Sequence, residues 1–132
     1  MIYRTLGRSG LNVSAVSIGS WRTYGQQEDI ETADQCLATA YDRGINFFDG
    51  AEAYGAGAAE EAMGEIFSRH KWPRDTYIVS SKVIRVGEQP TQRGLSRKHL
   101  VEACDAALRR MGLDYLDLFF CHRPDPDTPL EE

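Results

Sequence analysis

Four polar residues, Asp49, Tyr54, Lys82 and His122, stand at or just beyond short apolar runs of this sequence. The runs that close with Asp49, Lys82 and His122 have the composition of buried strands, and Tyr54 lies in the loop after the first run. If these runs are parallel strands of one sheet, the four side chains converge at its carboxyl edge. That edge is where α/β proteins place their chemistry.

A carboxylate, a phenol, an ammonium and an imidazole brought together suit proton donation to a carbonyl oxygen. A phenol has an unperturbed pKa of about 10, too high for easy donation at neutral pH, and an adjacent ammonium favours its ionisation. Lys82 can supply that ammonium, and Asp49 can hold Lys82 in place. His122 can orient a substrate carbonyl, so the expected reaction is carbonyl reduction, with hydride from a cofactor and a proton from Tyr54.

A structural explanation is also compatible with these residue types. A lysine–aspartate pair at a strand end is often only a salt bridge, and a tyrosine in a loop often serves only packing. Perturbed groups cluster at functional sites, but they occur in structural networks as well. Residue types and spacing alone leave both interpretations open.

The elements that must position these residues alternate between strand and helix, after a small hairpin within residues 1–14. Strands are expected at residues 15–18, 45–49, 76–82 and 115–121. Helices are expected at residues 31–43, at 58–68, and from the N-cap Ser96 to a stop at Gly112. Apolar strands that alternate with helices predict the α/β class, a parallel sheet covered by helices.

The final residues predict the start of a fourth helix. Thr128 is followed by Pro129 and by Glu131 and Glu132, which favour a helix N-terminus. We therefore expect residues 1–132 to be part of one domain, truncated at the start of that helix.

A glycine pattern after the second strand has two interpretations. Gly55-Ala56-Gly57 begins like a dinucleotide-binding fingerprint, but Glu60 occupies the position of its third glycine. A partial glycine motif is weak support for such a site. An ordinary helix N-terminus in a βα loop is the favoured interpretation.

Composition argues against several classes of protein. A net charge of -5, a pI near 5.2 and scattered basic residues argue against a nucleic-acid surface. Without a long apolar segment or a signal peptide, we expect no membrane insertion and a cytoplasmic location. Isolated cysteines and histidines predict no metal site, and we expect His70 and His99 to lie on the exposed surface.

Several segments resemble the aldo-keto reductases, a family of (β/α)8 barrels that reduce aldehydes and ketones with NADPH. The family motifs are residues 48–55 (FDGAEAYG), the strand end at Lys82 and residues 121–124 (CHRP). Residues 3–11, 40–46, 93–99 and 123–126 are similar to the branch related to voltage-gated potassium-channel β subunits. The resemblance implies that residues 1–132 form the N-terminal half of the barrel, about four βα units after a hairpin.

The resemblance also assigns roles to the site residues. It implies that Tyr54 is the general acid, Lys82 and Asp49 its activating pair, and His122 the residue that orients the carbonyl. Contacts to NADPH (NADP+) are implied for Ser20, Trp21, Gln27, Asp49 and His122. The implied partner is a small carbonyl substrate.

Two departures from the family pattern bear on function. Gly50 stands where the family usually has threonine, which removes a hydroxyl and a β-branch next to Asp49. The channel β subunits carry asparagine where this chain has His122, so His122 favours a working reductase. The alternative is a non-catalytic nicotinamide sensor like those β subunits.

A half barrel has open edges and an open inner face, so we expect it to form a homo-oligomer or to need its C-terminal half for activity.

Overall fold

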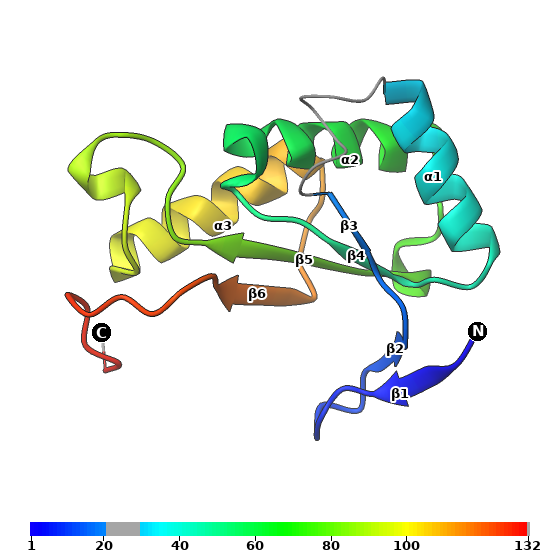
Figure 1. The fold of residues 1–132 in the computed structure, drawn as a ribbon, viewed down its shortest axis with the longest axis horizontal. Helices are drawn as coiled ribbons and strands as arrows, with labels where there is room; N and C mark the ends of the chain where they lie inside the picture. Colours follow the sequence, from blue (N-terminus) through cyan, green and yellow to red (C-terminus); the bar gives the residue numbers. More distant parts are fainter. Residues whose placement is uncertain (21–29, 132) are drawn as a thin grey trace.

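The computed structural model describes residues 1–20 and 30–131 (Figure 1). The strands are β1 (Tyr3–Thr5), β2 (Asn12–Ser14), β3 (Ile18–Gly19), β4 (Phe47–Asp49), β5 (Ile78–Val83) and β6 (Leu118–Cys121). The helices are α1 (Ile30–Asp42), α2 (Ala58–His70) and α3 (Arg97–Met111), with short 3-10 turns η1 (Tyr54–Gly57), η2 (Arg74–Thr76) and η3 (Pro90–Gln92). Strands β1 and β2 pair as an antiparallel hairpin, and the other four form a parallel sheet in the order β3-β4-β5-β6. The predicted hairpin and α/β sheet are confirmed.

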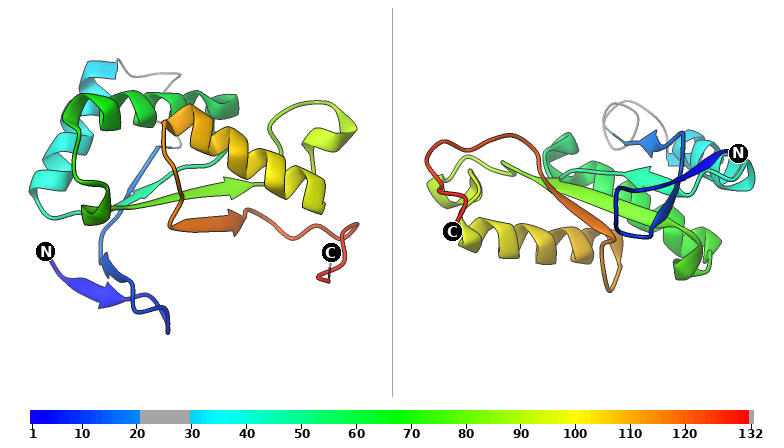
Figure 2. Two further views of the ribbon diagram at one scale, coloured as in Figure 1. Left: turned by 180° about the vertical axis from the view of Figure 1, so that it is seen from behind. Right: turned by 90° about the horizontal axis from the view of Figure 1, so that it is seen from below.

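The three helices lie along one face of the sheet, and the β1–β2 hairpin projects away on the side opposite the helices (Figures 1 and 2). The core fills the layer between sheet and helices. Phe48 of β4 meets Phe67 of α2 edge to face, with ring centroids 5.7 Å apart, and stacks on Trp72 at 5.9 Å. A Cβ on Gly64 of α2 would stand 2.7 Å from the Met111 Cα, so glycine permits the close approach of α2 and α3.

The strand register decides which side chains share the face opposite the helices. Asp49 pairs with Ser80, and Lys82 pairs with Phe120. Because side chains alternate along a strand, Asp49, Ser80, Lys82 and Phe120 all point to this face. Phe120 is 42% exposed there, as expected for the inner face of an open half barrel.

All four predicted strands of the sheet begin earlier in the sequence than the strands observed, the first and the fourth by three residues. Residues 15–17 are exposed, because the Ala15 N–H bonds the Ile2 carbonyl beside the hairpin and not the sheet. The fourth strand begins at Leu118 and not at residue 115, since the Asp117 side chain accepts from the Val79 N–H and from Arg74. The Asp117 side chain thus accepts the Val79 N–H, while the Asp117 N–H still donates to the Val79 carbonyl at 3.1 Å.

The ends of the helices mostly follow the sequence signals. The Ser96 hydroxyl caps α3 by accepting from the His99 N–H, and Gly112 ends that helix with φ +64°. At the end of the described chain, residues 126–131 form turns and not the helix expected from Thr128, whose hydroxyl donates to Asp125. Within the described residues, none of the helices is long and apolar enough to cross a bilayer.

Candidate active site

Lys82, near the carboxyl end of β5, is the centre of a polar cluster on the sheet face away from the helices. Its Nζ lies 2.5 Å from Asp49 Oδ2, 3.0 Å from the Gly50 carbonyl oxygen and 3.0 Å from the Tyr54 hydroxyl. The ammonium thus uses its three hydrogens on three acceptors. The convergence of Asp49, Tyr54 and Lys82 predicted from strand ends is present in the structure.

The Asp49 carboxylate is held on both of its oxygens. Oδ1 accepts from the Ser80 hydroxyl at 2.6 Å, and Oδ2 accepts from Lys82. The Asp49 and Lys82 side chains are 26% and 17% exposed, so the pair is only partly solvated. Partial burial strengthens the attraction relative to a surface pair, and the second bond from Ser80 fixes the carboxylate's orientation. Ser80 was not predicted from the sequence as a site residue. Its place opposite Asp49 on the neighbouring strand is the signal that could have identified it.

Tyr54 is aimed at Lys82 by an unusual turn. The residues after it, Gly55, Ala56 and Gly57, all have positive φ, at 60°, 53° and 97°. An alanine in this left-handed region is costly by about 1–2 kcal/mol, which the surrounding contacts must offset. Gly57 is the N-cap of α2, so the glycines form a helix entry, as the favoured interpretation expected. The Lys82 Nζ also lies 4.9 Å from the centre of the Tyr54 ring.

His122 completes the group from the end of β6. Its backbone N–H continues the sheet by donating to the Val83 carbonyl at 3.0 Å. Its ring meets the Tyr54 ring edge to face, with centroids 5.8 Å apart and planes at 79°. Among the described residues, the buried Nδ1 of His122 has no hydrogen-bond partner. A ring nitrogen without a partner can form a hydrogen bond with a ligand atom placed beside Tyr54.

Burial lowers the pKa of His122 below its ordinary value, and the charges of Lys82 and Arg123 lower it further against an opposing effect of Asp49. The imidazole is therefore neutral at pH 7. The unfolded chain binds the proton more readily, so the folded state loses stability as pH falls through about 6.5.

The His122→Asn variant should therefore lose less unfolding free energy than the unmodified protein between about pH 7.5 and 5.5. Urea unfolding of both proteins at the two pH values measures the difference. Parallel losses in the two proteins would show that His122 does not titrate with a lowered pKa.

A cavity of about 490 Å³ opens beside His122. It is lined by Ala53, Ala56, Ile84, Arg85, Val86, Glu88, His122 and Arg123. Its volume lies in the range of pockets that hold small ligands. It is bounded by the Tyr54 turn, the loop after β5 and the end of β6, the elements that also carry the polar cluster.

Glu52 and His99 form a buried pair behind the Tyr54 turn. Glu52 Oε1 accepts from the Ile84 N–H at 2.7 Å, and Oε2 lies 3.5 Å from His99 Nε2. His99 is 3% exposed, so its predicted surface position is wrong. It occupies the first turn of α3, and the buried residues His99, Ala103, Ala107 and Met111 recur every fourth position. That spacing was the signal that could have placed His99 on the buried face.

Gly50 lies close to the sheet and α2. A Cβ there would stand 3.3 Å from the Ser80 carbonyl oxygen and 3.6 Å from the Met63 sulfur. The absent side chain would thus point toward α2, while the Asp49 carboxylate is held by Ser80 and Lys82.

Three of the five residues expected at the nicotinamide cofactor lie together. The Ser20 N–H and hydroxyl both donate to the Asp49 carbonyl, at 3.0 and 3.2 Å. His122 lies next to this pair because its ring contacts the ring of Tyr54. Trp21 and Gln27 lie outside the described residues. The unpartnered His122 Nδ1, next to an ammonium–carboxylate pair at an open sheet edge, is chemically compatible with a bound nicotinamide amide.

Comparisons with known proteins identify relatives of this chain. The profile of the Aldo/keto reductase family matches residues 15–132. Proteins called "Probable voltage-gated potassium channel subunit beta" from Arabidopsis thaliana and Oryza sativa subsp. japonica are 47% and 48% identical to all of this chain. The chain spans 40% of their length.

A solved structure shows the fold independently. The crystal structure of a thermostable aldo-keto reductase in complex with the inhibitor epalrestat matches the whole chain with a TM-score of 0.84 and 33% identity. The match covers 46% of that reductase. The four parallel strands and their helices correspond to one half of a barrel. The chain therefore belongs to the aldo/keto reductase family, with the fold of the N-terminal half of its (β/α)8 barrel.

Proposed function

We propose that the complete protein containing this chain reduces aldehydes and ketones to alcohols with NADPH. One observation carries the proposal: the Lys82 ammonium lies 2.5 Å from the Asp49 carboxylate and 3.0 Å from the Tyr54 hydroxyl. A salt bridge with a purely structural role has no need of a phenol on its third hydrogen. The chain spans 40% of its relatives, so the activity is proposed for the whole protein.

The proposed roles follow from the contacts. The Tyr54 oxygen accepts a hydrogen from Lys82, an orientation in which its own O–H can donate to a substrate carbonyl oxygen. As that proton moves, the fixed ammonium stabilises the phenolate, and Asp49 holds the ammonium in place. Neutral His122 contacts the same carbonyl and orients it toward Tyr54. NADPH, when bound, supplies the hydride.

Ser20, Asp49 and His122 are the residues proposed to border the nicotinamide, together with Trp21 and Gln27. The support in the structure is the backbone contact that places Ser20 against Asp49 at neighbouring strand ends. NADPH rather than NADH is proposed from the family resemblance.

The test is steady-state oxidation of NADPH by the full-length protein with a simple aldehyde such as 4-nitrobenzaldehyde. We expect many turnovers per site and one alcohol formed per NADPH consumed. The same assay with NADH should give a lower kcat/KM. An absence of turnover in a folded protein that binds NADPH would contradict the proposal.

The second candidate is a nicotinamide-sensing subunit that contacts a channel, favoured by the two relatives named as potassium channel β subunits. It predicts tight NADPH binding with at most one slow oxidation per site. Histidine at position 122, where the family resemblance implies asparagine in channel β subunits, supports the reductase. Single-turnover and steady-state rates of the same protein separate the two candidates.

A further inference from the structure

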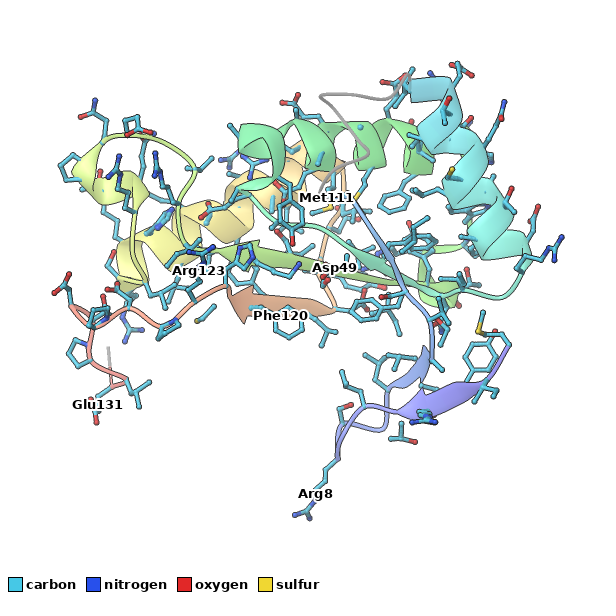
Figure 3. The ribbon with its side chains drawn as sticks, in the orientation of Figure 1. Arg8, Asp49, Met111, Phe120, Arg123 and Glu131 are labelled. Atoms are coloured by element: carbon cyan, nitrogen blue, oxygen red, sulfur yellow. The ribbon has the colours of Figure 1, made fainter. Side chains whose placement is uncertain are left out.

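Two arginines line the cavity next to His122. Arg85 comes from the loop after β5, and Arg123 follows His122 directly at the end of β6. Figure 3 labels Arg123 near the tips of these strands, at the end of the sheet toward which the Asp49 cluster opens. In the proposed mechanism Arg123 has no part in proton transfer, so its place in the cavity wall calls for another explanation.

The charge around this cavity is positive in a chain whose net charge is -5. Glu88 is the acidic residue of the lining, and it forms salt bridges with Arg85 and with Arg93. Of the two arginines in the lining, Arg85 is paired with the Glu88 carboxylate, and Arg123 is not. Arg123 is exposed and forms no salt bridge within the described residues, so its charge is open to solvent and to a ligand.

Arg123 is held in place by the segment that follows it. Asp125 Oδ2 accepts from the Leu95 N–H and from the Thr128 hydroxyl, each at 2.7 Å. Pro124, between Arg123 and Asp125, restricts the backbone further. The chain after β6 is thus pinned to the loop after β5, which fixes the backbone that carries Arg123 beside that loop. The Arg123 charge also reaches His122, where it contributes to the lowered pKa.

We propose that Arg123, assisted by Arg85, binds an anionic group of the substrate, so that the preferred substrates are small aldehydes or ketones carrying a carboxylate. This inference rests on the proposed function. A guanidinium binds a carboxylate through two parallel hydrogen bonds, and such charge-assisted bonds are the strong ones. With the carbonyl at Tyr54 and His122, the acid group of the substrate occupies the cavity of about 490 Å³ beside them.

The experiment compares two substrates of one shape, 4-carboxybenzaldehyde and its methyl ester, with the full-length protein and NADPH. We expect kcat/KM to favour the acid over the ester, and Arg123→Gln to reduce that ratio by about tenfold or more, the usual effect of losing a charge-assisted bond. Arg85→Gln should reduce the ratio less, because Arg85 already pairs with Glu88. The control is Arg8→Gln, the same charge change in the exposed turn between β1 and β2, far from the cavity (Figure 3). It should leave the ratio unchanged.

The outcomes separate this inference from the function on which it rests. Turnover of the ester without preference for the acid would overturn the inference and leave the reductase activity standing. If neither compound turns over, calorimetric binding of both to the unmodified protein and to Arg123→Gln decides: equal affinities would overturn the inference. A weaker NADPH affinity in Arg123→Gln with an unchanged acid-to-ester ratio would assign the arginine to the cofactor phosphates, and the substrate proposal would then be wrong.

Discussion

Replacing Tyr54 with phenylalanine should lower kcat for aldehyde reduction by about 10²–10⁴-fold, the usual contribution of a general acid, while the Kd of NADPH changes little. The substitution removes one oxygen, which accepts from Lys82 at 3.0 Å. Lys82 keeps its bonds to Asp49 and to the Gly50 carbonyl, so the cluster should persist. Steady-state kinetics and a fluorescence titration of NADPH give the two quantities.

Tyr115→Phe is the matched control. Tyr115 is 46% exposed and precedes β6, at the opposite end of the strand from His122. Loss of its hydroxyl should leave kcat unchanged. If Tyr54→Phe weakened NADPH binding as much as it lowered turnover, Tyr54 would have a structural role and the mechanism proposed above would be wrong.

Replacing Arg110 with methionine should lower the free energy of unfolding by about 3 kcal/mol, because it leaves a buried carboxylate without its cation. Glu60 of α2 is fully buried, with Arg110 Nε at 2.6 Å from Oε2 and the Ser81 hydroxyl at 2.5 Å from Oε1. The Arg110 side chain is only 17% exposed, so water does not replace it readily. Urea unfolding of the full-length variant measures the loss.

Two further variants make this prediction specific. Arg109→Met removes the same charge from an exposed neighbour on α3 and should change stability by no more than about 0.5 kcal/mol. The double variant Glu60→Leu with Arg110→Met should regain most of the loss, since no charge is then left buried. Equal effects of the changes at 109 and 110 would show that the Glu60 ion pair is unimportant for stability.

The Glu60–Arg110 pair also contacts the strand that carries Lys82, through the Ser81 hydroxyl. Ser81, which donates to Glu60, precedes Lys82 on β5 and points to the helix side. Ser81 and Glu60 therefore connect the α2–α3 layer with β5, the strand that carries Lys82. Loss of Arg110 is expected to lower activity only through unfolding, so kcat per folded molecule should stay near that of the unmodified protein.

Local patterns in the sequence were sufficient for the fold class and for three of the strand ends. Asp49, Lys82 and His122 stand at or near the ends of short apolar runs, and parallel strands bring such ends to one edge. The Ser96 cap and the Gly112 stop were likewise readable, because capping depends on residues adjacent in sequence. Strand starts at 15 and 115 were wrong, because hydrogen bonds to distant Ile2 and Val79 decide them.

The residue types of the candidate site, a phenol, an ammonium, a carboxylate and an imidazole at or near strand ends, were readable from the sequence alone, as was the α/β fold that presents them. Three features emerge only from the packed fold: Ser80 fixes Asp49, Glu52 and His99 are buried together, and Arg123 lines a cavity beside His122. The difference follows from separation along the sequence, because the signals for strands and helices lie between residues that are close in sequence. These contacts instead join residues 30 or more positions apart, or loops whose approach depends on the packed sheet.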